Sequence, residues 1–216
     1  MLCTRLVVIE HFNKRRRGNE TAGRAVTALP AGQTRRMPRA QRREQIIDAA
    51  TRAFARAGFT DTGLNAIASE AGVSLVILYR HFASKADLYR AVLQSACNRL
   101  RDAVGADSFD DTSLPALVRA AAADPDGFRL IFRHAAREPE FRDEVDALRT
   151  SATAITHRHL ANIHDDEWRA WAARLLPTLT TDAVTAWLDA GQPEPDRAAI
   201  RIRRIVDAVI EAARSR

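Results

Sequence analysis

The chain has 216 residues, 46% of them hydrophobic and 28% charged, so it is long enough to bury the core of one or two domains. Its two cysteines, Cys3 and Cys97, form no CxxC pair and have no histidine at metal-ligand spacing, which argues against a disulfide scaffold and a zinc site. The apolar run 6–9 is too short for a secretory leader, and no segment has the roughly 18 uncharged apolar residues of a membrane span. We therefore expect a cytoplasmic protein.

The net charge of +6 is concentrated at the start of the chain. Residues 1–36 hold eight Lys and Arg residues against two acidic ones, and the rest of the chain has no net charge. Because this stretch is rich in Gly, Pro and polar residues, we expect a disordered basic arm. Two interpretations stay open: an arm that grips DNA electrostatically, or an extension without a role, untranslated if the true start is Met37.

Helical periodicity begins at Arg39. Apolar residues then recur at steps of three and four, which predicts an amphipathic helix that ends at Gly58. A second helix is predicted from residue 63 or 64 to 71, and a third over 75–81, after a turn at 72–74. Ser84, with Asp87 three residues later, predicts the start of a fourth helix that reaches about residue 101.

Beyond residue 110 the pattern predicts further helices, separated by breaks at Pro115, 124–127, Pro139, 164–166 and 191–193. No run alternates with a period of two for long enough to predict a strand. The expected fold is all-α, with an N-terminal three-helix helix-turn-helix domain at 39–90 and a C-terminal helical bundle at 91–216. Pro177 is expected to kink or locally break the penultimate helix if it lies inside it.

The segment 64–82 has the residues that a tight helix-turn-helix needs. Ala68 is small enough to sit where two short helices touch, and Gly72 can adopt positive φ at the turn. Ser74 can cap the third helix. These features are also compatible with an ordinary helical hairpin inside a bundle, and the spacing alone does not separate the two interpretations.

The wider context resembles the N-terminal domain of the TetR family of bacterial regulators. The resemblance covers residues 42–93 and depends mainly on Gly58-Phe59, Ile67-Ala68, Ala71-Gly72-Val73-Ser74, Leu78-Tyr79-Arg80-His81-Phe82 and Ser84-Lys85. It implies a DNA-binding transcriptional regulator whose third helix enters the major groove. It further implies a homodimer on a palindromic operator, and a repressor relieved by a small molecule.

The resemblance also assigns roles to individual residues. The side chains implied to contact phosphates are Arg39, Arg42, Arg43, Thr62, Ser74, Tyr79, Arg80, His81 and Lys85, and those implied to face base edges are Asn65, Leu75, Val76 and Ile77. The chain departs from the family at Gly63, where members often carry a hydroxyl residue, and at Val76 and Ile77, where they usually carry small residues. The apolar side chains can contact thymine methyl groups but donate no hydrogen bonds, so we expect Asn65, Arg80 and DNA shape to contribute to base reading.

The C-terminal bundle is expected to enclose a ligand cavity. Candidate ligand-binding residues are Phe128, Phe132, Trp168 and Trp171, although such an aromatic stripe is also typical of plain core. His157 and His159 point to different faces of a helix, so we expect no metal site.

The last two long helices, at about 167–190 and 196–213, carry much apolar surface and are expected to pair with a second copy. Two alternatives remain. One is a dimeric ligand-binding adaptor that does not touch DNA, and the other is a small helical enzyme. The sequence has no GxSxG, P-loop or Gly-rich dinucleotide turn, so we expect no catalytic residues and no cofactor.

Overall fold

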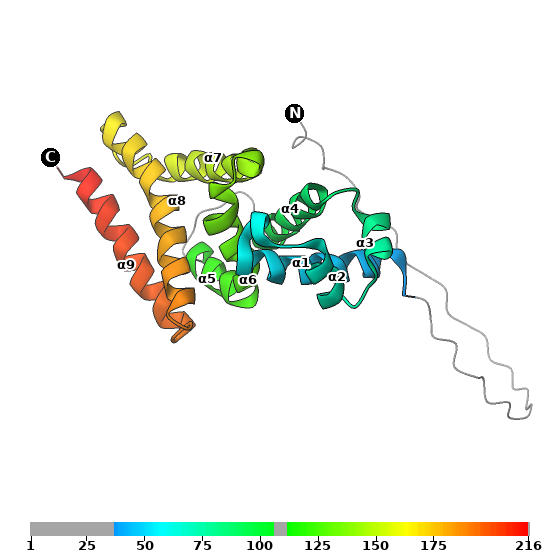
Figure 1. The fold of residues 1–216 in the computed structure, drawn as a ribbon. Helices are drawn as coiled ribbons and strands as arrows, with labels where there is room; N and C mark the ends of the chain where they lie inside the picture. Colours follow the sequence, from blue (N-terminus) through cyan, green and yellow to red (C-terminus); the bar gives the residue numbers. More distant parts are fainter. Residues whose placement is uncertain (1–36, 106–111, 216) are drawn as a thin grey trace, which may run out of the picture. The chain divides into compact units, whose positions relative to one another are not determined.

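This computed structural model describes residues 37–105 and 112–215. These residues form helices joined by short loops, and they contain no strand (Figure 1). The all-α prediction is confirmed, whereas the expected basic arm at 1–36 lies outside the described residues. The α-helices are α1 (Arg39–Asp61), α2 (Leu64–Glu70), α3 (Leu75–His81), α4 (Lys85–Val104), α5 (Ser113–Ala123), α6 (Pro125–Arg129), α7 (Arg142–His159), α8 (Asp166–Asp189) and α9 (Pro195–Arg214). Between α6 and α7 the chain forms a π-helical turn, η1 (Leu130–His134), and two 3₁₀ turns, η2 (Ala135–Arg137) and η3 (Pro139–Phe141).

The first four helices follow the sequence pattern closely. The ends of α2, α3 and α4 agree with the predictions within a few residues, and Ser84 caps α4 by accepting a hydrogen bond from the Asp87 backbone N–H at 3.0 Å. The expected end of the first helix at Gly58 is confirmed. Gly58 has φ of 75° and ψ of 179°, and a separate helical turn follows it to Asp61, so α1 consists of two helical pieces joined at a kink.

One hydrophobic core holds these four helices together. Ile46, Phe54, Ile67, Leu78 and Leu88 are all fully buried in it. The same core takes in four residues from beyond α4, namely Leu130, Ala135, Phe141 and Val145. The predicted boundary between the two domains, at residues 90 and 91, falls inside α4. The division of the chain into these two domains stays a prediction.

The C-terminal helices build two further clusters. Residues of α5, α6, α8 and α9 form one cluster, and residues of α8, α9 and the segment between α7 and α8 form the other. The long helices α8 and α9 lie side by side at the end of the described unit away from α3 (Figure 1). Pro177 lies inside α8, which continues through it without interruption, so no break occurs there. None of the helices in the described ranges is long and apolar enough to cross a membrane.

Candidate nucleic-acid interface and cavity

The turn between α2 and α3 depends on Gly72. Its φ is +62°, the left-handed region that L side chains rarely adopt, and a Cβ built on it would meet nothing within 4 Å. The backbone closes tightly here, since Val73 N–H donates to the Ala68 carbonyl at 2.9 Å. Ala68, 4% exposed, lies in the core between the helices. The helix-turn-helix geometry expected from the sequence is present.

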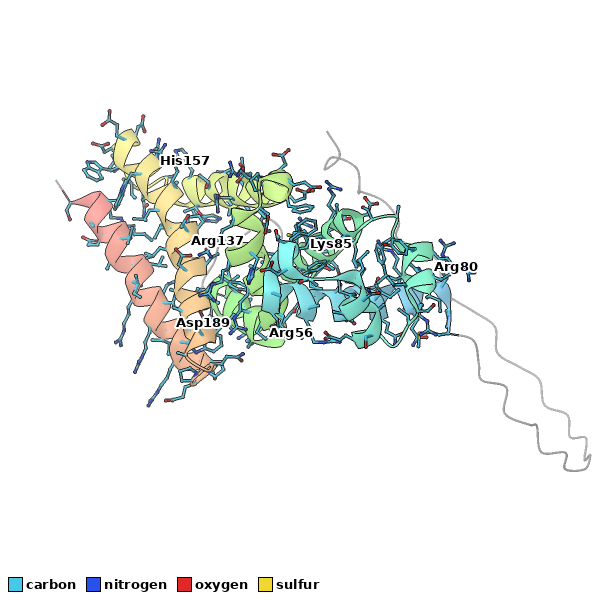
Figure 2. The ribbon with its side chains drawn as sticks, in the orientation of Figure 1. Arg56, Arg80, Lys85, Arg137, His157 and Asp189 are labelled. Atoms are coloured by element: carbon cyan, nitrogen blue, oxygen red, sulfur yellow. The ribbon has the colours of Figure 1, made fainter. Side chains whose placement is uncertain are left out.

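The third helix presents one face to solvent. The Ser74 hydroxyl caps it by accepting a hydrogen bond from the Ile77 N–H at 3.3 Å, and Leu78 anchors the opposite face in the core with no exposure. Val76 is 62% exposed and Tyr79 53% exposed, which is unusual for large apolar and aromatic side chains. Arg80 extends away from the helices (Figure 2). The outer face of α3 is therefore available to a partner.

The residues implied to face base edges do not all lie on that outer face. Asn65 and Val76 are exposed, but Leu75 and Ile77 are half-buried, and Leu75 packs against the N-terminal core. Thr62 is buried at 4% exposure, and its hydroxyl donates to the Gly58 carbonyl at 2.6 Å. This internal hydrogen bond counts against the phosphate contact implied for Thr62.

The start of α1 lies beside the end of α3 and brings basic residues together. Arg43 lies over the Phe82 ring at 5.0 Å from the ring centre, and Arg39 is exposed nearby. Partial burial lowers the pKa of His81, and the charges of Arg39, Arg43 and Arg42 lower it further. These charges act on His81 because the three arginines lie near its imidazole, next to the exposed face of α3. A phosphate group would find several cations there.

Lys85, the first residue of α4, makes internal contacts in this structure (Figure 2). Its Nζ donates to the Thr60 carbonyl at 3.0 Å and lies 4.7 Å from the centre of the Phe59 ring. An ammonium group has three N–H donors, so two remain for another acceptor. Lys85 can therefore tie α4 to the end of α1 and still reach a phosphate.

Two polar contacts that position the turn were not predicted. Gln45 on α1 donates from Nε2 to the Ala71 carbonyl at 2.9 Å, at the start of the turn. Glu70, at the end of α2, is held by Arg52 at 2.8 Å and by Arg56, and the hydrogen bond from Arg56 is the main cause of its lowered pKa. These partners are 14 to 26 residues apart in sequence, so no local pattern indicates them.

A cavity of about 220 Å³ lies between α4, α5, α7, α8 and the π-helical turn. Its apolar wall includes Leu100, Leu117, Phe132, Val145, Leu148 and Ile155. Of the four predicted ligand-binding residues, Phe132 lines this cavity, and Phe128 lines a neighbouring one of about 180 Å³.

The two tryptophans predicted for the ligand site lie elsewhere. Trp168 is 49% exposed and Trp171 is 37% exposed, and neither lines either cavity. They pack edge to face on each other at the start of α8, with ring centres 5.4 Å apart. Their exposure counts against a role as ligand contacts. Within the part of the chain that the structure describes, no group of His, Cys, Asp and Glu residues could hold a metal ion.

The π-helical turn η1 is tied to helices on two sides. Arg133 of η1 lies 2.7 Å from the carboxylate of Asp189, at the end of α8, and Arg129, the last residue of α6, lies 3.1 Å from the same carboxylate. His134 lies on the other side, against the non-helical Gly58 of α1. Burial, and then the charges of Arg133 and Arg137, lower the pKa of His134. The segment η1, which lines the cavity through Phe132, thus lies beside α1, the helix that supports the turn between α2 and α3.

Comparison with known proteins agrees with this geometry. Residues 46–92 match the family model described as "Bacterial regulatory proteins, tetR family". The chain is 33% identical over 189 residues to the HTH-type transcriptional activator FasR of Mycolicibacterium smegmatis, a match that covers 80% of this chain and 85% of that protein. It is also 49% identical over 53 residues to the HTH-type transcriptional regulator TtgR of Pseudomonas putida, covering 24% and 25% of the two chains.

Solved structures share the fold. A TetR-like transcriptional regulator from Rhodococcus sp. RHA1 superimposes with a TM-score of 0.68 at 24% identity, covering 82% of this chain and 96% of that one. A tetR-family regulator from Streptomyces coelicolor gives a TM-score of 0.64 at 23% identity, covering 82% and 83%. The chain therefore belongs to the tetR family of bacterial regulatory proteins: it is a DNA-binding transcriptional regulator and not an enzyme.

Proposed function

We propose that this regulator is a cytoplasmic homodimer that represses transcription from a palindromic operator and is released when a small molecule fills the cavity. The observation that carries the DNA-binding part is the outer face of α3. Val76 and Tyr79 are more than half exposed there, on a helix whose position is fixed by the Gly72 turn and the buried Leu78. A helix held rigidly with one face exposed suits insertion into a major groove.

The operator contacts follow from exposure. We propose that Val76 and Asn65 face base edges, with Leu75 and Ile77 at the margin, and that Val76 contacts a thymine methyl group. The proposed phosphate contacts surround this face and are Arg39, Arg42, Arg43, Ser74, Tyr79, Arg80, His81 and Lys85.

The outer faces of α8 and α9 support the proposed dimer. Ile200 is 56% exposed and Ile205 is 45% exposed on α9, in addition to the exposed tryptophans of α8. In the middle of α9 three exposed arginines, Arg197, Arg201 and Arg204, precede two exposed acidic residues, Asp207 and Glu211, while the exposed Asp196 and Arg214 at the two ends carry the opposite sign. An antiparallel pair of α9 helices would place the three arginines of one copy near Asp207 and Glu211 of the other. Such self-complementarity is what a two-fold interface requires.

The cavity supports ligand control because one of its walls is α4, which begins at the helix-turn-helix. A ligand that requires α4 or η1 to shift would change the spacing of the two α3 helices in the dimer. A preference of a few kcal/mol for the shifted state is enough to empty the operator.

Operator binding tests the proposal directly. Fluorescence anisotropy would measure the affinity of the purified chain for the DNA upstream of its own gene, over a range of salt concentrations. We expect Tyr79→Ala to weaken binding by at least about ten-fold, because one hydrogen bond to a charged acceptor is worth about 1.5–3 kcal/mol. Arg158→Ala, an exposed change on α7, is the matched control and should bind like the unaltered chain.

Two results would reject the proposal. If Tyr79→Ala binds as tightly as the control, α3 is not the recognition helix. If affinity does not fall steeply with salt, the chain makes no set of phosphate contacts, and the adaptor interpretation gains support. Sedimentation of the free chain measures the dimer independently.

A further inference from the structure

Thr180 is the buried hydroxyl residue of the cavity wall whose hydroxyl lacks a partner among the described residues. Thr156 and Thr181, which line the same cavity, each donate their hydroxyl to the carbonyl four residues earlier in the helix, at 2.8 and 3.1 Å. Ser151 and Thr178 also line it, but both are exposed to solvent. Thr180 is only 5% exposed and lines the cavity, yet its hydroxyl makes no hydrogen bond to any described residue. The Thr180 hydroxyl oxygen is not fully enclosed by protein atoms, whereas the Tyr89 hydroxyl oxygen is. Because Thr180 lines the cavity, a ligand in the cavity can contact this oxygen.

The cavity wall combines apolar side chains with a few hydroxyl residues. Leu117 of α5 and Phe132 of η1 line the same cavity as Thr180, as do Thr156 and Thr181, whose hydroxyls are bonded within their own helices. A ligand that fills this part of the cavity displaces solvent from the Thr180 hydroxyl. A purely apolar ligand would then leave the hydroxyl without a partner, at a cost of roughly 1–3 kcal/mol, whereas a ligand with a hydrogen-bonding group avoids that cost. The cavity therefore favours a mainly apolar ligand that brings one polar group to the Thr180 hydroxyl.

The exposed side of the cavity does not select for charge. Arg101, Arg149 and Asp182 line it, so both signs are present. The two arginines also have partners of their own, since Arg101 donates to Asn98 at 2.9 Å and Arg149 lies 3.5 Å from the Asp146 carboxylate. Exposed charges of mixed sign contribute little to binding. Discrimination must then come from shape and from Thr180.

The size of the cavity limits the ligand further. A cavity of about 150 Å³ is known to hold one benzene ring. The volume here, about 220 Å³, has room for a body of about two fused rings or an equivalent aliphatic group. Larger ligands would have to extend past the exposed side.

From these observations we infer that the cavity binds an uncharged, mainly apolar molecule that carries a hydroxyl or carbonyl group at its buried end, and that Thr180 is the residue that recognises this group. The inference rests on the proposed function, because it takes the cavity to be the effector site. It adds the chemical class of the effector and the residue that determines specificity.

Equilibrium dialysis of the full chain against 2-naphthol and naphthalene tests the inference, because the two compounds differ by one hydroxyl. We expect Thr180→Val to weaken 2-naphthol binding about ten-fold and to leave naphthalene binding within about two-fold, since valine has the same shape but no hydroxyl. Thr181→Val is the matched control: Thr181 also lines the cavity, but its hydroxyl is committed to the Pro177 carbonyl. It should change neither affinity. Thermal unfolding of each variant verifies that it is folded.

Three results would overturn the inference. The first is a Thr180→Val variant that loses both compounds equally, which would make the residue a packing contact. The second is a variant that loses neither, and the third is failure of both compounds to bind the unaltered chain. Dialysis contains no DNA, so a failure here leaves the proposed repressor function standing. Binding of 2-naphthol with no change in operator affinity would instead overturn ligand control while supporting the ligand class.

Discussion

Two glycines flank α2, and serine substitutions at them test the steric basis of the helix-turn-helix. Gly63 is the N-cap of α2 with φ of −88°, in the extended region, whereas Gly72 follows α2 with φ of +62°. A Cβ at either position would meet nothing within 4 Å. The two sites therefore differ in backbone conformation and not in crowding.

The expected effects have opposite signs. At Gly63, serine reduces the entropy of the unfolded chain, worth about 0.4–1 kcal/mol, and adds a capping hydroxyl worth a few tenths. At Gly72, the left-handed conformation costs a side chain about 1–2 kcal/mol, which exceeds the same entropic gain. We expect Gly63→Ser to be more stable than the unaltered chain by about 1 kcal/mol and Gly72→Ser to be less stable by a similar amount.

Thermal unfolding measures this difference. For a chain of this size, about 1 kcal/mol corresponds to a shift of roughly 2–4 °C in the melting temperature, so the two variants should differ by about 4–8 °C. If Gly72→Ser melted at the same temperature as Gly63→Ser, the turn would not depend on the positive φ of Gly72. Operator affinity gives a second measurement: Gly63→Ser should bind at least as tightly as the unaltered chain, and Gly72→Ser more weakly.

Three further predictions concern single side chains. Tyr89 is fully buried, its hydroxyl has no hydrogen-bond partner, and burial raises its pKa. Tyr89→Phe should therefore raise the free energy of unfolding, measured by urea titration, by about 1 kcal/mol; a clear loss of stability would mean that the hydroxyl has a partner. Lys85→Met should lower that free energy by about 1 kcal/mol, through loss of the Thr60 and Phe59 contacts, and reduce the salt slope of operator binding by about one per chain; an unchanged slope would remove Lys85 from the interface. The pKa values of His81 and His134 are both lowered on folding from an ordinary value of 6.5, so the unfolded chain binds protons more readily. Their contribution to stability is fully present above pH about 6.5 and is lost as the pH falls through the lower folded values, and unfolding between pH 7.5 and 5.5 should show a decline that His81→Asn and His134→Asn each reduce.

The N-terminal helices could be predicted because their determinants are local. Ser74, Ser84 and Gly72 specify caps and a turn within a few residues of themselves, and the spacing of Ile46 and Phe54 indicates the buried face of α1. The same locality explains the helix end at Gly58, where glycine permits the positive φ of a C-terminal cap. The helical turn that follows Gly58 was not predicted; Thr62 closes it by donating to the Gly58 carbonyl, a contact that the capping pattern does not indicate.

The cavity could not be predicted from pattern alone. Phe132, Phe128 and the tryptophans Trp168 and Trp171 have similar spacing and chemistry in the sequence, yet one lines the main cavity, one a smaller cavity, and two lie at the surface. The difference arises from the π-helical turn at 130–134 and from how α7 and α8 cross, which are tertiary features. Periodicity reports which face of a helix is apolar but not what covers it.

The polar contacts of the helix-turn-helix suggest how the two halves of the chain are related. Gln45, Arg52, Arg56 and Glu70 join α1 to α2 and to the turn, so α1 fixes where α3 lies. The cavity side of the molecule also acts on α1, because His134 follows the cavity-lining Phe132 by two residues and packs against Gly58. A displacement of η1 by a ligand would therefore reach α3 through a helix that already carries its positioning contacts. Gly58 is the point at which that helix leaves regular geometry, and a non-helical residue can change its dihedral angles at lower cost than one inside a hydrogen-bonded turn.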